Sequence, residues 1–589
     1  MSITASTPAT AADPAADPAV VAAHDAVADG ERLRPGRRQV LTVAGAGVVT
    51  AALASCTPLS PTASLTSATA AGTAGSGAAL APKAVATDPA ASAGVAGSGA
   101  ARSTATLPIL RAQSVVAAGA PVPNLLGTDP VWHLLRRATF GPTPALVAEV
   151  RAIGAAAWLN QQLNPAAIDD SACDAYLTRY PSLPMTTMQL RAGYPKYSGG
   201  PMMELGRATL ARALFSKRQL FEVMVEFWSN HFNVTTPSGE AWDVKTVEDR
   251  EVIRKNALGK FSALLQASAK SAAMGRYLDN ASSSADTLNE NYGRELLELH
   301  TVGRDAGYTQ AEVVDSARLM TGYTIGRHGE FAYYNDWRYL GPVKVLGFTS
   351  PNDNDFNGLH VAESYLDYLA HHPATATRLA TKLATRFVSD TPPASLVTLL
   401  ANTYLANDTA IVPVLRALFT SAEFTSSIGQ KTKRPLEDVL GAARTVGVTP
   451  APGDATSLGG LYWNINGLGQ APLNWGPPNG FPDVAGAWLS TSGLLGRWNS
   501  HMGVIRGWWT DGMTTPAFAT LLGGATPADN GALVDVLSNR LLGIRLADAQ
   551  RTPLVTFLDA GTPRVADSIK WRIDITAALL LDSPNWIQR

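Results

Sequence analysis

Carboxylates, amides, an arginine and a histidine are concentrated in residues 289–303, whose sequence is NENYGRELLELHTVG. With about 100° of rotation per residue, this stretch predicts an amphipathic helix. Its apolar side carries Tyr292, Leu296 and Leu299, and its polar side carries Asn291, Glu295 and Glu298. Because the apolar side has to be buried, the carboxylates of the polar side are the first candidates for chemistry.

The spacing within this helix excludes a metal site built from its own histidine and glutamates. A metal-binding Glu-x-x-His pair lies on one face of a helix. His300 follows Glu298 by two residues and Glu295 by five, which places it about 200° and about 140° away around the helix. We therefore assign no metal ligands, and the sequence does not indicate which cofactor, if any, the protein binds. A histidine that works with Glu295 has to come from another segment.

His231 is the candidate for that histidine. It ends a predicted helix, seven residues after Met224 on the apolar side, and Asn230 and Asn233 lie beside it. One interpretation is a core histidine bonded to a backbone carbonyl. The other is a ligand or general base, since histidine exchanges protons near neutral pH.

The two glutamates of the helix differ in their neighbours. Arg294 lies four residues before Glu298, so these two side chains can form a surface ion pair worth a few tenths of a kcal/mol. Glu295 has no opposite charge three or four residues away, which makes it the more interesting carboxylate.

We predict that polar residues from three segments share one pocket, in which the side chains of Glu295 and His231 lie within roughly 10 Å of each other. The residues expected on its rim are His231, Asn230, Asp279, Asn280, Asn291 and Glu295. The catalytic candidates are His231, Glu295, Asp279 and Asn291, and the substrate-binding candidates are Asn230, Asn280, Trp463 and Trp475. Such a set favours general acid/base hydrolysis, with a glycoside as one substrate class.

Residues 459–509 are rich in tryptophan, glycine and proline, and include Trp463, Trp475, Trp488, Trp498 and Trp508. Glycine and proline favour turns, so part of this region is predicted to be an ordered loop. Its indoles are either packed on the core or exposed to a ligand such as a sugar.

The segments that position these residues are predominantly helical. The fold class is all-α, a large multi-helix domain over 125–589 with two lobes. Helices are expected at 144–163, 218–234, 360–371, 373–388, 394–406, 410–421, 434–446, 531–543 and 565–581. Capping-box spacing occurs at Thr246-x-x-Asp249 and Thr309-x-x-Glu312. The segment 331–345 is the best place for a small hairpin.

The first 124 residues have the composition of targeting and linker segments. Arg37 and Arg38 precede the apolar run 40–54, which predicts a twin-arginine export signal over 1–55. The sequence LASC before position 57 resembles a lipobox and predicts a lipid on Cys56; the alternative is ordinary cleavage nearby. Residues 56–124 are rich in Ala, Ser, Thr, Gly and Pro, which is typical of a disordered tether.

Charge and cysteine content exclude several classes of protein. The chain carries a formal net charge of −1 and no basic run outside the export signal, so a nucleic-acid partner is not expected. Its two cysteines are Cys56 and Cys173, so a disulfide framework is excluded and Cys173 is expected to be buried. Phosphate-loop, dinucleotide-binding, zinc-protease and G-x-S-x-G motifs are absent from the sequence.

Nine motifs in order give the chain a family resemblance. They are HLLRRATFG (133–141), FWSNHFNV (227–234), AMGRYLDN (273–280), 289–303, YTQ (308–310), ARLMTGY (317–323), GPVKVLG (341–347), RFVSD (386–390) and KRPLE (433–437). The chain resembles the bacterial family called domain of unknown function 1800. The resemblance implies an exported, mainly helical protein, often encoded beside an exported sulfatase-like family, and implies no established reaction. Family members often carry a histidine where Arg338 stands here.

Two classes of function follow. The first is an extracytoplasmic hydrolase that acts on a cell-envelope or extracellular polymer through the His/carboxylate pocket. The second is a non-catalytic envelope-binding or assembly protein that uses the Trp-rich region 459–509. The candidate partners are a cell-envelope polymer and an exported sulfatase-like protein, and the only expected membrane attachment is the lipid at Cys56.

Overall fold

The computed structural model describes residues 126–589, apart from 355, 451–457 and 509–512. The predicted export signal with Arg37 and Arg38, the lipid site Cys56 and the tether over 56–124 therefore lie outside the described residues. Among the helices that the structure describes, none is long and apolar enough to cross a membrane.

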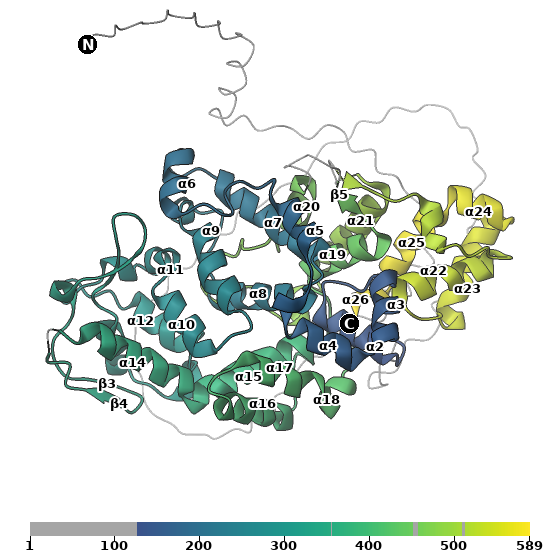
Figure 1. The fold of residues 1–589 in the computed structure, drawn as a ribbon. Coiled ribbons are helices and arrows are strands. Elements are labelled where there is room, and N and C mark those ends of the chain that lie inside the picture. The colour runs from purple at the N-terminus through teal and green to yellow at the C-terminus, as the bar shows by residue number, and fades with distance from the viewer. Residues whose placement is uncertain (1–125, 355, 451–457, 509–512) are drawn as a thin grey trace, which may run out of the picture. The chain divides into compact units, whose positions relative to one another are not determined.

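The described chain is mostly helical, which confirms the all-α prediction (Figure 1). Its first part holds α2 (Pro130–Ala138), α3 (Pro144–Ile153), α4 (Ala155–Gln162), η2 (Pro165–Ala167), α5 (Ser171–Leu177), α6 (Thr187–Gly193), α7 (Gly200–Phe215), α8 (Gln219–His231), η3 (Gly239–Ala241), α9 (Lys245–Glu248), η4 (Asp249–Arg254), α10 (Phe261–Ala269), α11 (Ala272–Tyr277), η5 (Asn280–Ser282), α12 (Asn291–Glu295), η6 (Leu296–His300), η7 (Arg304–Ala306) and α13 (Gln310–Leu319).

The second part adds short strands between further helices. Its elements are β1 (Tyr323–Ile325), β2 (Phe331–Tyr333), η8 (Asn335–Trp337), β3 (Val343–Val345), β4 (Phe348–Ser350), α14 (Gly358–His371), α15 (Pro373–Phe387), α16 (Ala394–Ala406), α17 (Ile411–Phe419), α18 (Ala422–Thr425), α19 (Pro435–Val446), β5 (Thr449–Pro450), α20 (Gly459–Gly467), η9 (Ala485–Ala487), α21 (Thr491–Arg506), β6 (Met513–Thr514), η10 (Phe518–Leu522), α22 (Asn530–Leu542), α23 (Asp548–Gly561), α24 (Val565–Trp571), α25 (Ile573–Leu581) and α26 (Pro584–Ile587).

The described strands form antiparallel pairs, of which β1–β2 and β3–β4 are local hairpins and β5–β6 joins Thr449 to Thr514. Strand β1 pairs with β2 through Tyr323 opposite Tyr333, and β3 pairs with β4 through Val343 opposite Ser350. The predicted hairpin over 331–345 is therefore divided. Its first strand, β2, pairs backwards with β1, and its last, β3, pairs forwards with β4.

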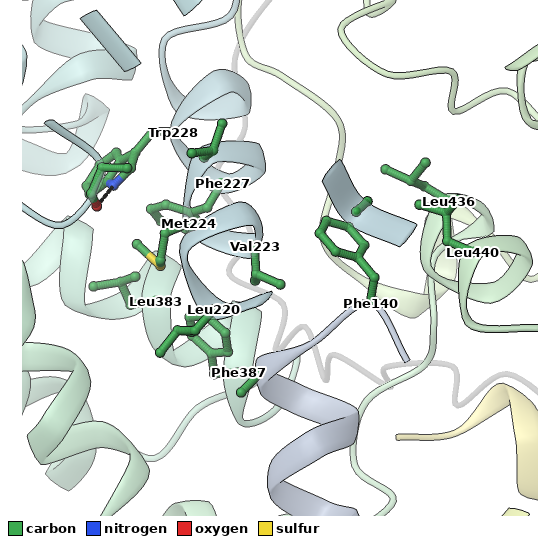
Figure 2. Close-up of a cluster of buried hydrophobic side chains, with 14 of the residues drawn as sticks. Phe140, Leu220, Val223, Met224, Phe227, Trp228, Leu383, Phe387, Leu436 and Leu440 are labelled. Carbon is green, nitrogen blue, oxygen red and sulfur yellow. Dashed lines mark hydrogen bonds between the residues drawn. The ribbon is translucent and has the colours of Figure 1, made fainter. Parts of the chain in front are cut away.

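Helix α8, which ends at His231, lies at the centre of a cluster of buried apolar side chains. Figure 2 shows Leu383 and Phe387 of α15 on one side of α8, and Phe140, Leu436 and Leu440 on the other. These side chains are almost completely buried. Burying a side chain of this size stabilises the fold by about 1.5–3 kcal/mol. Packing on both sides therefore fixes the position of α8 and of His231, its last residue.

A tryptophan of α8 adds a polar contact to this packing. The indole N–H of the buried Trp228 donates to the carbonyl oxygen of Ala257, 2.9 Å away. Figure 2 shows Trp228 on the same helix as Met224 and Phe227. A buried indole needs such an acceptor, so this bond sets the rotation of α8 about its own axis.

The stretch 289–303 is not one regular helix. It is α-helical over α12 and then π-helical over η6, where the wider turn takes in one extra residue and rotates the side chains that follow. Within α12 and η6 the buried residues are Tyr292, Gly293, Leu296, Leu297 and His300, whereas Leu299 is only half-buried. The predicted apolar side was therefore correct up to Leu296 and wrong beyond it.

Side-chain pairs along this stretch also differ from the prediction. Arg294 pairs with Glu290 at 3.2 Å, and Glu298 pairs with Arg304 at 3.2 Å, in place of the predicted pair between Arg294 and Glu298. Of the two capping boxes, the one from Thr309 to Glu312 is present. Thr246 lies inside α9 and caps no helix.

Candidate functional site

A cavity of about 460 Å³ lies where four segments meet. Its walls come from the C-terminal end of α8, the C-terminal half of α15, Arg434 just before α19, and the loop 475–484 of the Trp-rich region. This volume is within the range of small-molecule pockets, which is about 300–1,000 Å³. The cavity therefore has room for a ligand.

His231 is 1% exposed and lines this cavity. Its Nε2 lies 3.0 Å from the carbonyl oxygen of His300, which can only accept a hydrogen bond, so Nε2 carries the proton. Its Nδ1 is then a lone pair, and it accepts from Nζ of Lys382, 2.9 Å away. Burial, with the charge of Lys382, lowers the pKa of His231 well below its usual range. The imidazole is therefore neutral, and both of its nitrogens are occupied.

Lys382 on α15 contributes an amine to the cavity lining. Its side chain is half-buried, and burial and the charge of Arg378, opposed by Asp483, together lower its pKa to about 7. Near neutral pH both the ammonium and the free amine are populated. Because Nζ donates one hydrogen to His231, the lone pair of the free amine remains available to the cavity.

The ring of His300 lies behind His231. The two ring centroids are 6.3 Å apart, and His300 is completely buried. Neither of its ring nitrogens has a hydrogen-bond partner among the described residues. Burial, with the charges of Lys382 and Arg378, lowers the pKa of His300 to about 3. A second neutral imidazole thus lies beside the cavity wall.

A buried ion cluster lies next to these basic groups. Glu437 pairs with Arg386, with Arg434 at 3.2 Å and with Arg589 at 2.9 Å. Arg434 also reaches Glu226 at 2.9 Å. Burial raises the pKa of Glu437, but Arg386, Arg589 and Arg434 together hold it well below its usual range. These charges are matched within the cluster.

Asp483 belongs to the same cluster and lines the cavity. It lies 3.2 Å from Nζ of Lys431. Burial raises its pKa, but the positive charges of Arg434, Lys431 and Arg386 lower it by more, so the net shift of the pKa is downwards. Asp483 therefore stays ionised and cannot donate a proton at neutral pH.

Three of the sequence-predicted residues line the cavity: His231, Asn230 and Trp475. The Asn230 side chain donates to Glu226 and accepts from the backbone N–H of Phe481 at 3.3 Å, so it joins the loop 475–484 to α8. The indole N–H of Trp475 donates to Asn479 at 2.9 Å, and its ring packs on Phe481.

The other predicted residues do not line this cavity. Asp279 is exposed, and the amides of Asn280 and Asn291 donate to the backbone oxygens of Met320 and Leu278, each at 3.4 Å. Glu295 is half-buried, and burial together with Glu298 raises its pKa. Trp463 lies on α20 and is 56% exposed. The structure thus divides the six residues expected on one rim, because α8 and the π-helical η6 meet at their C-terminal ends.

Comparison with known proteins identifies the family. The model described as Protein of unknown function (DUF1800) matches residues 133–588. The chain belongs to this family. No curated protein and no solved structure matches it.

Several cavity residues of this DUF1800 chain lie in segments that carry the family resemblance. Asn230 and His231 lie in 227–234, Arg386 begins 386–390, and Arg434 lies in 433–437. Within the described part of the chain, no group of three or more His, Cys, Asp or Glu is placed to hold a metal ion.

Sequence reasoning missed the lysine of this DUF1800 site. Arg378, Lys382 and Arg386 recur every fourth residue along α15, which places them on one face of the helix. Basic residues repeated on one face of a helix with a buried apolar side were the available signal. Glu226 was also missed, although it lies four residues before Asn230 and therefore on the same face of α8.

Proposed function

We propose that this chain is an exported hydrolase that acts on a cell-envelope or extracellular polymer, with Lys382 as general base and His231 holding it in place. The observation that carries this proposal is the 2.9 Å contact between Lys382 Nζ and His231 Nδ1 at a cavity wall. A general base works best when its pKa is near the working pH, and burial brings Lys382 to about 7.

The reaction needs one base and one returning proton. The amine of Lys382 takes a proton from water, and the oxygen of that water bonds to the carbon of the scissile bond. The bond from this carbon to the leaving group then breaks, and the leaving group takes its electron pair and the proton of the ammonium, which restores the amine. His231 cannot exchange this proton, because its two nitrogens are bonded to His300 and Lys382. It is therefore a positioning residue.

The ion cluster limits the type of bond that is cleaved. Glycoside hydrolysis uses a carboxylic acid that is protonated at neutral pH. Asp483, a carboxylate of the cavity, is held ionised by Arg434, Lys431 and Arg386. Glu226 is paired with Arg434. We therefore favour an ester or amide bond over a glycosidic one.

The route to the envelope is part of the same proposal. Arg37 and Arg38 ahead of the apolar run 40–54 support twin-arginine export, and Cys56 is the candidate for lipid attachment, with 56–124 as the tether. Replacing both arginines by lysine is expected to leave precursor in the cytoplasm. Replacing Cys56 by alanine is expected to release the protein from membranes, and unchanged membrane attachment would exclude the lipid.

The test of hydrolysis uses the exported full chain and isolated envelope polymers that contain ester- and amide-linked groups. Fragments released into solution are measured by mass spectrometry. Lys382→Met is expected to abolish release, whereas Lys344→Met, which changes an exposed lysine of β3, is expected to leave it unchanged. Full release by the Lys382 variant would contradict the proposal.

A second function is favoured by the exposed indoles of the Trp-rich region. Trp463 is 56% exposed, which suits a flat ring that stacks on a sugar. In this alternative the chain binds an envelope polymer or an exported sulfatase-like protein without cleaving it. Polymer binding that is lost in Trp463→Ala, with no release of fragments by the unaltered chain, would favour it.

A further inference from the structure

The amine of Lys382 has one free direction after its bond to His231 is made. Since Nε2 of His231 donates to His300, Nδ1 has to accept, and the amine therefore donates to it. A neutral amine has two hydrogens and one lone pair. One of these hydrogens is donated to His231, so the lone pair of Lys382 Nζ is not engaged by that hydrogen bond. A lone pair that can take a proton from water can also attack carbon.

We propose that Lys382 is a covalent nucleophile, which forms an imine with an aldehyde or ketone bound in the cavity between α8, α15 and the loop 475–484. This inference goes beyond hydrolysis, because the lysine itself becomes bonded to the ligand. It needs the same cavity but does not need a polymer substrate.

The surroundings of Lys382 support attack on a carbonyl carbon. The cavity lining is mixed: Phe227, Trp475, Phe481 and Pro482 form its apolar part, and polar residues such as Thr381 and Asn479 form the rest. Imine formation releases water, so the apolar part of the lining favours the product. The nearby guanidinium groups of Arg386 and Arg434 are occupied by Glu437 and Glu226. They therefore leave the amine as the reactive group.

The chemistry balances without an added oxidant or reductant. The nitrogen lone pair forms a bond to the carbonyl carbon, and the C=O π pair moves to oxygen. A proton passes from nitrogen to that oxygen and gives a carbinolamine. The hydroxyl group then leaves with the second amine proton as water, and the C=N double bond forms. Burial, which lowers the pKa of Lys382 to about 7, keeps part of the amine unprotonated at neutral pH.

The experiment measures the reactivity of each lysine in the unaltered full chain, so no variant has to fold. The chain is exposed briefly to a limiting amount of formaldehyde and cyanoborohydride at pH 7. Cyanoborohydride gives a hydride to each imine, which leaves a stable methylamine that peptide mass spectrometry locates. A solvated lysine is almost wholly protonated at pH 7. Lys382 is therefore expected to be labelled about tenfold or more faster than the exposed Lys255 and Lys344.

Two further arms separate this inference from a merely reactive surface. In urea the preference for Lys382 is expected to disappear, because the cavity no longer exists. Glyceraldehyde in place of formaldehyde is expected to keep the preference, because the cavity of about 460 Å³ can hold it. Labelling of Lys382 no faster than of Lys255 with both aldehydes would overturn the inference.

The outcome is distinguishable from the outcome for hydrolysis. Fast labelling of Lys382 with no fragments released from any polymer supports the imine and contradicts the hydrolase. Slow labelling of Lys382 with release that depends on Lys382 overturns the imine and leaves the hydrolase standing.

Discussion

The ring of His231 donates from Nε2 to the carbonyl oxygen of His300, 3.0 Å away, and this bond joins the end of α8 to the end of η6. Because this carbonyl belongs to the π-helical turn, the turn decides which nitrogen of His231 is left for Lys382. The irregular end of the helix over 289–303 thus acts on the cavity through the tautomer of one histidine.

Replacing His231 by phenylalanine is expected to destabilise the chain and disturb Lys382. A phenyl ring can form neither of the two hydrogen bonds of His231, and the carbonyl oxygen of His300 is left without its donor. A buried polar group left without a partner costs about 1–3 kcal/mol. The free energy of unfolding from urea titration is expected to fall by that amount. His328→Phe, at an exposed histidine, is the control and is expected to change little.

The packing of α15 on α8 predicts a large effect at Phe387. This residue is completely buried, and its ring centroid lies 5.0 Å from that of Phe419. Phe387→Ala is expected to lower the free energy of unfolding by about 3–5 kcal/mol, through lost burial and a cavity. Phe356→Ala removes a ring that is 94% exposed and is expected to change it by less than about 0.5 kcal/mol. Equal losses in the two variants would contradict the packing shown in Figure 2.

The buried carboxylate of Glu437 pairs with three arginines. Glu437→Gln removes the charge that Arg386, Arg434 and Arg589 share. Breaking a buried ion pair from one side costs about 3–5 kcal/mol, because a charge is left without compensation. We expect a loss of that order in a urea titration, or insoluble protein. Glu149→Gln, at an exposed position of α3, is expected to have no such effect.

His501 predicts a stability term that depends on pH. Burial lowers its pKa, but Asp438 at 3.3 Å and Asp582 at 2.9 Å raise it to about 9. The folded pKa is above the ordinary value near 6.5, so this stabilisation is complete below pH 6.5 and is lost as pH rises through 9.

Lys382 acts in the opposite sense, because its folded pKa is lowered to about 7 and its contribution to stability improves as pH rises above that value. The His501 term is therefore measured as the difference between the unaltered chain and His501→Gln. This difference is expected to shrink by about 2–3 kcal/mol between pH 6 and pH 9.5. A difference that does not vary with pH would mean that folding does not shift the pKa of His501.

The parts of the fold that were predicted well are those with strong helical periodicity. The helix predicted over 394–406 has the bounds of α16. The one predicted over 144–163 is two helices, because Gly154 has φ of 90° and ends α3 before α4 begins. A single glycine inside a periodic pattern does not show which conformation it takes. The segment 565–581 is likewise divided, into α24 and α25.

The candidate site was predicted in part. His231 and Asn230 were identified because polar residues at the end of an apolar helix are visible in the sequence. Lys382 was not, since its partner His231 lies 151 positions away and its pKa depends on burial. Glu295 was favoured because it lacked a neighbouring cation, but the π-helical turn that follows it was not visible in the sequence.

The loop 475–484 closes the cavity through close contacts with α8, and Gly480 is the position that tests them. Gly480 has φ of 71°, and a Cβ there would lie 2.1 Å from the backbone oxygen of Asn230. An alanine would add a left-handed strain of about 1–2 kcal/mol and force the loop away from α8. Asn233 also ties the loop, by donating to the carbonyl oxygens of Trp475 and Pro477, each at 2.8 Å.

Gly480→Ala is therefore expected to speed hydrogen exchange of the amides over 475–484 by tenfold or more, as local opening becomes easier by about 1.4 kcal/mol. Gly476→Ala is the control in the same loop, because a Cβ there would meet no atom within 4 Å. Both variants are compared with the unaltered chain by exchange mass spectrometry at one pH and temperature. If Gly480→Ala exchanges no faster than Gly476→Ala, the loop is not held by its contact with Asn230, and the cavity is more open than the structure shows.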